Sequence, residues 1–170
     1  MCESLGYLLR SAGLCARTFT SAAAFLADFR RERPGCVVLD VRMPGMSGLE
    51  LHAQLAREAP GLPVILLTGH GDIPMAVRSV QAGALDFLEK PVNDGVLIRR
   101  IRAALELDRG NRERQRQQAQ LTTLLATLTD RERDVMELIV AGRANKQIAA
   151  DLGIREKTVE VHRKHVLDKM

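Results

Sequence analysis

Two short runs of consecutive apolar residues constrain the fold of this chain more than any other feature. Cys36–Leu39 and Val64–Leu67 are apolar at every position, and β-branched residues are frequent in both. Strands of this composition are typical of parallel sheets that helices cover on both faces. Ala16–Thr20 and Leu85–Leu88 are weaker strand candidates. Amphipathic stretches lie between the strands, so the pattern predicts a doubly wound α/β domain.

The helical stretches of this domain are predicted at residues 21–32, 47–59, 72–82 and 94–108. Ser47 and Glu50 have the spacing of a capping box at the start of the second stretch. Gly83 is placed to end the third stretch in a left-handed conformation. Residues 109–126 are polar at first and contain no proline, so they form either a linker or a solvated extension of the preceding helix.

Residues 127–170 contain three further helical stretches. Thr129 and Glu132 have capping-box spacing before the first, Asp130–Ala141. Asn145–Leu152 and a third helix that begins near Glu156 are separated by a short turn with a glycine, which is the pattern of a helix-turn-helix. In the third helix, the helical spacing of three apolar residues predicts that they face the core: Val159, Val166 and Met170.

Charge and composition exclude a mainly disordered chain and indicate a class of binding partner. The chain has 25 Lys and Arg against 21 Asp and Glu, and 46% of its residues are hydrophobic, which excludes a mainly disordered state. Residues 1–108 hold 12 basic and 12 acidic side chains, whereas residues 109–170 hold 13 and 9. A basic segment on a neutral body indicates contact with a polyanion, although a solvated surface explains it equally well.

The cysteines and the apolar runs suggest where the protein works. The 3 cysteines are an odd number without Cys-x-x-Cys spacing, so we expect neither a disulfide framework nor a zinc site. No apolar run approaches the roughly 20 residues of a membrane helix, and no signal-peptide pattern opens the chain. We therefore expect a cytoplasmic protein with no membrane partner.

Three polar residues of different chemistry follow three successive strand candidates: Cys36–Leu39, Val64–Leu67 and Leu85–Leu88. Asp40, Thr68 and Lys90 supply a carboxylate, a hydroxyl and an ammonium group at the carboxyl ends of their strands, where open parallel sheets bind ligands. This set suits capture of a phosphoryl group by the carboxylate, with the hydroxyl, the ammonium and a Mg²⁺ ion holding the phosphoryl oxygens. Taken singly, each residue is better explained as a loop cap or a surface charge, but three such residues at three successive strand ends favour a phosphoryl site.

Three motifs give this part of the chain a specific resemblance. DVRMPGMSG at 40–48, LLTG at 66–69 and DFLEKP at 86–91 resemble the receiver domain of two-component response regulators, which has a flavodoxin-like fold. The resemblance implies that a histidine kinase phosphorylates Asp40 and that Mg²⁺ is the cofactor. It also implies that Thr68, Lys90 and Phe87 sense the phosphoryl group, with a cis bond between Lys90 and Pro91. The metal would be held by Asp40 and the main-chain carbonyl of Arg42.

One departure from the receiver pattern bears on the metal. Receivers begin with a strand that ends in an acidic pair, whereas Met1–Leu5 matches the helix that follows this strand. Without the acidic pair, we expect weak Mg²⁺ binding and slow or absent phosphoryl transfer. We also expect a chain that is truncated, has a misassigned start, or folds poorly alone.

The third C-terminal helix carries an apolar residue among charges on its outward face. An isolated valine there, Val161, fits contact with a thymine methyl group in the major groove. LTDRE at 128–132, NKQIA at 145–149 and TVEVHRK at 158–164 resemble the LuxR/FixJ-type helix-turn-helix of bacterial transcription regulators. The resemblance implies DNA contacts by these residues: Glu160, Val161 and Lys164 in the groove, and Asn145, Lys146, Lys157 and Thr158 on the backbone.

These observations predict a DNA-binding response regulator that phosphorylation of Asp40 switches, with the receiver at 1–108 and the helix-turn-helix domain at 127–170. We expect a homodimer in the phosphorylated state, although the last helix of the LuxR-type domain is absent. The alternative is an interaction protein that works without phosphorylation. An enzyme acting on a soluble substrate has little support, because the chain shows no acid/base pair and no Gly-rich phosphate loop.

Overall fold

The computed structural model describes residues 2–69 and 84–170. The chain divides into two compact units, Met1–Arg112 and Glu113–Met170, and each is considered by itself. The helix expected at 72–82 and its cap at Gly83 lie outside the described residues. No helix in the described part is long and apolar enough to cross a membrane.

The first unit is built on a parallel sheet in which the described residues form three strands. These are β1 (Val37–Asp40), β2 (Val64–Thr68) and β3 (Asp86–Glu89), in the order β1-β2-β3. Every residue of the central strand β2 is buried, as its uninterrupted apolar composition predicts. Each strand ends one residue later than predicted, and β1 and β3 also start one residue later, so Asp40 and Thr68 are the last residues of their strands.

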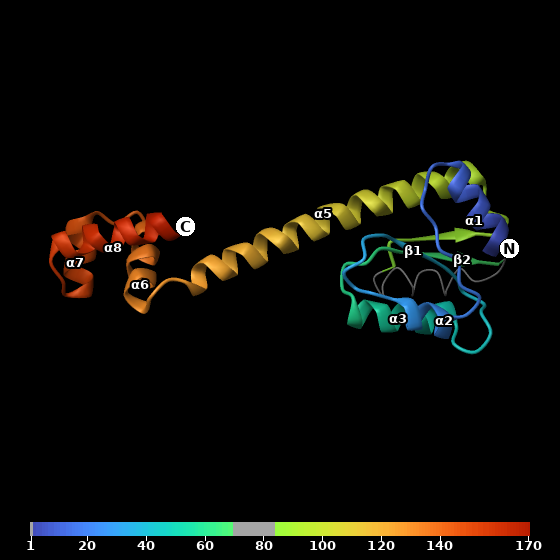
Figure 1. The fold of residues 1–170 in the computed structure, drawn as a ribbon, viewed down its shortest axis with the longest axis horizontal. Coiled ribbons are helices and arrows are strands. Elements are labelled where there is room, and N and C mark those ends of the chain that lie inside the picture. Colours follow the sequence, from blue (N-terminus) through green and yellow to red (C-terminus); the bar gives the residue numbers. More distant parts are fainter. Residues whose placement is uncertain (1, 70–83) are drawn as a thin grey trace. The chain divides into compact units, whose positions relative to one another are not determined.

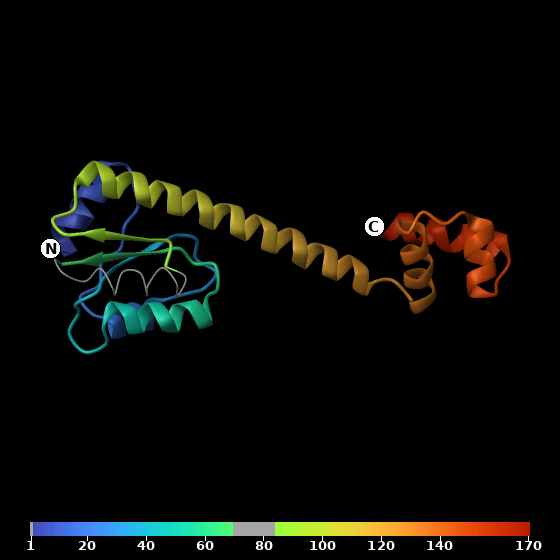
Figure 2. The ribbon, with the colours of Figure 1, turned by 180° about the vertical axis from the view of Figure 1, so that it is seen from behind.

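Helices cover both faces of this sheet (Figures 1 and 2). α1 (Cys2–Ser11) and α5 (Asp94–Ala126) lie on one face, and α2 (Ala22–Asp28) and α3 (Gly48–Glu58) lie on the other. Successive residues of β2 point to opposite faces, because side chains alternate along a strand. Ile65 and Leu67 pack with α1 and α5, whereas Val64 and Leu66 pack with α3. The doubly wound fold predicted from the sequence is confirmed.

Two elements of the first unit differ from the prediction. The strand expected at Ala16–Thr20 does not form, and no described strand lies beside it to accept its backbone hydrogen bonds. Ala16 instead packs against the core cluster under α1 and α5. The helix expected at 21–32 is α2 and ends at Asp28, because Phe29 is extended and Asp28 pairs with two arginines, Arg17 and Arg33.

The helix expected at 94–108 continues as α5 to Ala126. The carboxylate of Asp108, which is 3% exposed, accepts hydrogen bonds from the Gly35 amide at 2.9 Å and from Arg112 at 2.8 Å. Arg112 also donates to three main-chain carbonyls of the loop before β1: those of Arg31, Glu32 and Arg33. This loop precedes the amino ends of the strands, so the contacts hold α5 at the edge of the sheet opposite Asp40.

The second unit contains three short helices. These are α6 (Asp130–Val140), α7 (Asn145–Leu152) and α8 (Glu156–Lys169). Their shared core is formed by four buried residues: Val135, Ile148, Ala149 and Val159. Gly153, at φ +64°, ends α7 in the left-handed region, where a glycine is favoured.

The expected inward face of α8 is correct except at its end. Val159 and Val166 are buried, but Met170 is 46% exposed. Met170 follows the last helical residue, so the helical periodicity that predicted its direction no longer applies there.

Candidate functional site

The three polar residues at the strand ends lie at one edge of the sheet. Asp40 ends β1, Thr68 ends the neighbouring strand β2, and Lys90 directly follows β3. The Lys90 amide donates a hydrogen bond to the Thr68 carbonyl at 2.8 Å, which extends the ladder by one residue. Because the strands are parallel and in register, their carboxyl ends meet, as the sequence predicted.

The Asp40 carboxylate has a defined partner on each oxygen. Lys90 Nζ donates to Oδ2 at 2.5 Å, and the Arg42 amide donates to Oδ1 at 3.1 Å. The side chains of Asp40 and Lys90 are 25% and 26% exposed, so a reagent in solution can reach them. The Lys90–Pro91 bond is cis. A reachable carboxylate with a cation already on one oxygen has the chemistry of a site for a phosphoryl group.

Thr68 and Phe87 belong to the two strands that follow β1 in the sheet, β2 and β3. Thr68 is 4% exposed, and its hydroxyl donates to the Gly69 carbonyl at 3.3 Å. Phe87 lies opposite Leu66 in the β2–β3 register and packs, half-buried, against the core cluster on the α3 face. Both residues therefore belong to the strands that form the site and contact the interior.

Gly48 is a feature of this site that the sequence analysis missed. Its amide donates to the Val41 carbonyl at 3.1 Å, which holds the start of α3 against the end of β1. A Cβ atom at Gly48 would lie 2.2 Å from the Asp40 carbonyl oxygen. The available signal was a glycine, a poor helix former, directly after the capping residue Ser47.

The described residues fit a Mg²⁺ ion only in part. Mg²⁺ prefers six oxygen ligands in octahedral geometry and is often held by one or two carboxylates, water and substrate phosphate. Asp40 supplies one carboxylate, and its oxygens already accept hydrogen bonds from Lys90 and Arg42. In the described part of the chain, no three His, Cys, Asp or Glu residues are grouped as metal ligands.

The second candidate site is the outward face of α8 in the second unit. The sequence places five residues there, and all of them are exposed: Lys157, Glu160, Val161, Lys164 and Asp168. Val161 is 48% exposed, whereas Val159, two residues earlier, is fully buried. α8 therefore separates a core face from an exposed face. Lys146 and Thr158 are also exposed, and Asn145 is half-buried at the start of α7.

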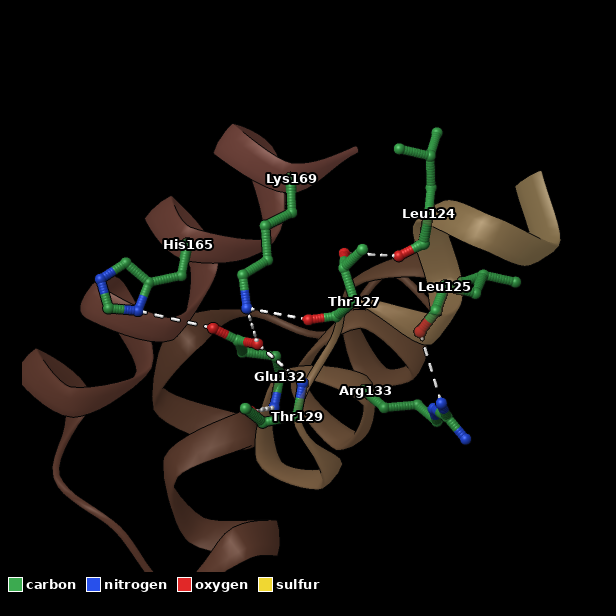
Figure 3. Close-up of polar contacts among 8 residues, drawn as sticks. All are labelled: Leu124, Leu125, Thr127, Thr129, Glu132, Arg133, His165 and Lys169. Atoms are coloured by element: carbon green, nitrogen blue, oxygen red, sulfur yellow. Dashed lines mark hydrogen bonds and ion pairs between the residues drawn. The ribbon is translucent and has the colours of Figure 1, made fainter. Parts of the chain in front are cut away.

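A buried carboxylate, Glu132, joins the start of α6 to the end of α8 (Figure 3). Glu132, 4% exposed, accepts a hydrogen bond from Lys169 Nζ at 2.6 Å and from the Thr129 amide at 2.8 Å. Lys169 also donates to the Thr127 carbonyl at 3.1 Å, and His165 Nδ1 lies 3.6 Å from the other oxygen of Glu132. These contacts orient α8, which carries the outward face.

The Glu132 contacts predict a pH dependence of stability. Lys169, and then the Thr129 amide, lower the pKa of Glu132 from 4.5 to about 2. A lowered pKa in the folded state stabilises the fold above pH 4.5, and this contribution is lost as the pH falls toward 2. In urea unfolding followed by hydrogen exchange in α6 and α8, Glu132→Gln should lower the free energy of unfolding at pH 7.

The difference between wild type and Glu132→Gln should shrink steadily between pH 5 and pH 2, since both then carry a neutral side chain. Glu137→Gln, an exposed residue of the same helix, is the matched control and should show little effect at either pH. A Glu132→Gln effect of equal size at pH 7 and pH 2.5 would contradict the assigned role of the charge.

Comparisons with known proteins identify two domains in this chain. Residues 1–102 match the response regulator receiver domain, and residues 126–170 match the bacterial regulatory proteins of the luxR family. Nodulation protein W of Bradyrhizobium diazoefficiens is 48% identical over 170 residues, 100% of this chain and 75% of that protein. The transcriptional regulatory protein FixJ of Azorhizobium caulinodans is 49% identical, over 99% of this chain and 80% of that protein.

A solved response regulator has a similar fold. The low-resolution structure of the response regulator StyR has a TM-score of 0.90 and 47% identity, covering 99% of this chain and 85% of that one. Regulators with a receiver and a helix-turn-helix domain act with histidine kinases and DNA, and receiver domains generally bind Mg²⁺ for phosphorylation. The chain belongs to the response regulators, and it is a transcriptional regulator with a receiver domain followed by a LuxR-type DNA-binding domain.

Proposed function

We propose that Asp40 is the phosphoacceptor of this regulator and that the state of Asp40 controls DNA binding. The observation that carries the proposal is the contact of Asp40 with Lys90 at 2.5 Å, between residues 50 positions apart, at the edge where β1 and β3 end. On this proposal the receiver occupies residues 1–108 and the DNA-binding domain residues 127–170, with 109–126 as a helical connection. Because its proposed partner is DNA, we assign the regulator to the cytoplasm.

The chemistry of the proposed transfer needs one nucleophile. A carboxylate oxygen of Asp40 attacks the phosphorus of a phosphohistidine on the kinase, and a P–O bond forms as the P–N bond breaks. The imidazole leaves and takes up a proton, and Asp40 becomes an acyl phosphate. Lys90 exchanges its contact with the carboxylate for one with a phosphoryl oxygen, so its charge remains paired throughout.

Sensing of the phosphoryl group is assigned to Thr68, Lys90 and Phe87. A phosphoryl oxygen on Asp40 offers the Thr68 hydroxyl a stronger acceptor than the Gly69 carbonyl it now uses at 3.3 Å. Movement of Thr68 opens space beside β3, and Phe87 turns further into the interior from its half-buried position. We propose that this shift changes the surface around β3 and favours a homodimer, which pairs two recognition helices on adjacent half-sites.

Mg²⁺ is assigned to the same edge, with Asp40 and the main-chain carbonyl of Arg42 as its protein ligands. When bound, the ion neutralises charge on the phosphoryl oxygens. Because the described residues hold no group of three His, Cys, Asp or Glu side chains that could bind a metal, the affinity should be low, and millimolar Mg²⁺ should be needed for phosphorylation. Lys90, already on Asp40, would then carry more of the charge neutralisation than in a site with several carboxylates.

The test of the phosphoacceptor uses acetyl phosphate as donor and the full chain. Incubation with acetyl phosphate and Mg²⁺ should add one phosphoryl group, which hydroxylamine removes because acyl phosphates react with it. Peptide mapping should place the group on the peptide that contains Asp40. A phosphoryl group on any other residue, or none at saturating Mg²⁺, would contradict the proposal. The family matches do not favour the alternative of an interaction protein without phosphorylation.

For DNA binding, we assign Glu160, Val161 and Lys164 to the major groove. Asn145, Lys146, Lys157 and Thr158 are assigned to the sugar-phosphate backbone. The exposed outward face of α8, opposite buried Val159, supports the assignment. Glu160 either accepts from a cytosine amino group or pairs with Lys164, four residues further along the helix.

Lys164→Ala should lower DNA affinity by roughly 10-fold and reduce the salt dependence of binding by about one counterion. The reason is that the exposed ammonium group of Lys164 would release one of the counterions condensed on the DNA. Fluorescence anisotropy with a labelled duplex at several salt concentrations measures both quantities. Arg99→Ala, an exposed arginine of the receiver, is the control and should change neither. An unchanged salt slope in Lys164→Ala would exclude Lys164 from the interface.

A further inference from the structure

Arg163 lies at the seam between the two helices of the helix-turn-helix. It is half-buried on the flank of α8, between the core face with Val159 and Val166 and the outward face with Glu160 and Lys164. Its guanidinium reaches across to the start of α7, where Nη1 donates a hydrogen bond to Asn145 Oδ1 at 3.2 Å. A side chain of the recognition helix is thus tied to a residue that the proposed interface places on the DNA backbone.

With this hydrogen bond formed, the side chains of Arg163 and Asn145 together present mainly N–H donors. The Asn145 carbonyl oxygen is engaged by Arg163, so the amide group of Asn145 presents two N–H donors. Arg163 has five N–H donors, of which this contact uses one. Among the described residues, no ion pair joins Arg163 to a carboxylate, in contrast to Arg131 with Asp134. An uncompensated cation beside an amide donor is suited to bind an anion.

We infer that Arg163 and Asn145 form a two-residue clamp for one phosphate of the DNA backbone. The inference rests on the proposed DNA interface and extends it to a residue outside that set. Three exposed lysines belong to the same proposed interface on α7 and α8: Lys146, Lys157 and Lys164. The guanidinium supplies the charge and two donors in a fixed plane, while Asn145 fixes its orientation and donates beside it.

The clamp can be tested without knowledge of the operator, since phosphate contacts are independent of sequence. The probe is a labelled mixed-sequence duplex, titrated with the full chain at several chloride concentrations. Arg163→Gln removes the charge and should weaken binding by roughly 10-fold and reduce the salt slope by about 1. Arg131→Gln removes the same charge from an arginine on α6 and should leave affinity and slope unchanged.

Asn145→Ala separates the clamp from a purely structural role of Arg163. It breaks the same hydrogen bond but keeps the cation, so affinity should fall by roughly 3-fold with the wild-type salt slope. In the double variant, the loss should be smaller than the product of the single losses, because the two residues act on one phosphate. Equal salt slopes in wild type and Arg163→Gln, or independent losses in the double variant, would overturn the clamp.

Circular dichroism and the melting temperature of each variant control for loss of the fold. If Arg163→Gln unfolds, Arg163→Lys replaces it: the clamp predicts a wild-type salt slope with weaker binding, since lysine cannot reproduce the planar donor pair. Wild-type affinity in Arg163→Lys would then contradict the clamp. A wild-type chain that binds no duplex at low salt would contradict the proposed DNA interface itself, and the clamp with it.

Discussion

Asp40→Asn should abolish phosphoryl uptake from acetyl phosphate while leaving the fold intact. The amide of asparagine is not a nucleophile toward phosphorus, yet it has nearly the same size, and its one carbonyl oxygen can accept a hydrogen bond from either Lys90 or the Arg42 amide. The lost ion pair joins side chains that are about a quarter exposed, so its loss costs about 1 kcal/mol or less of stability. Phosphate-affinity electrophoresis measures uptake, and urea unfolding measures the fold.

Asp94→Asn is the matched control for this experiment. Asp94 is an exposed carboxylate at the start of α5, which follows Lys90 and therefore begins at the same edge of the sheet. It should take up phosphoryl groups at the wild-type rate. Uptake by Asp40→Asn at more than a small fraction of that rate would show that another residue is the acceptor. A large loss of stability in Asp40→Asn would show that the carboxylate is structural.

Gly48→Ala should have the largest effect on the stability of the receiver. The added Cβ would lie 2.2 Å from the Asp40 carbonyl oxygen and 3.1 Å from the Val41 Cα, and both are backbone atoms that cannot rotate away. The start of α3 must then move from β1, which breaks the Gly48–Val41 hydrogen bond and displaces Asp40. We expect a loss of about 3 kcal/mol, measured by urea unfolding, and a matching loss of phosphoryl uptake.

The control is another glycine-to-alanine change within a helix. A Cβ at Gly110 in α5 meets no atom within 4 Å, so Gly110→Ala should be neutral or stabilise the chain by up to about 1 kcal/mol, because alanine is the better helix former. Equal stabilities of the two variants would mean that α3 tolerates a side chain against β1. The close approach of the two backbones would then not be required for the fold.

Local patterns in the sequence predicted much of the fold. The capping boxes of Ser47 with Glu50 and of Thr129 with Glu132 form as expected, and Asn145–Leu152 has the predicted bounds. These features depend on residues within four positions of one another, so composition and spacing carry the information. The apolar run of Val64–Leu67 likewise predicted burial on both faces, because every position of β2 lies in the core.

The incorrect expectations concern elements whose structure depends on distant neighbours. A strand at Ala16–Thr20 requires a partner strand, and the described sheet offers none. The end of α2 depends on Asp28, which pairs with Arg17 from one side and Arg33 from the other. Sequence periodicity within one element cannot predict such contacts with distant residues.

The sequence by itself determined the alternation of strands and helices, the caps, and which residues end the strands, because backbone and side-chain preferences act over a few positions. Only the tertiary structure decided which groups touch. Lys90 meets Asp40 across 50 positions, Arg163 meets Asn145 across 18, and the backbones of Gly48 and Asp40 meet too closely for a side chain. Such contacts depend on how packed elements approach one another, and the free energy that selects them comes from burial of the whole core.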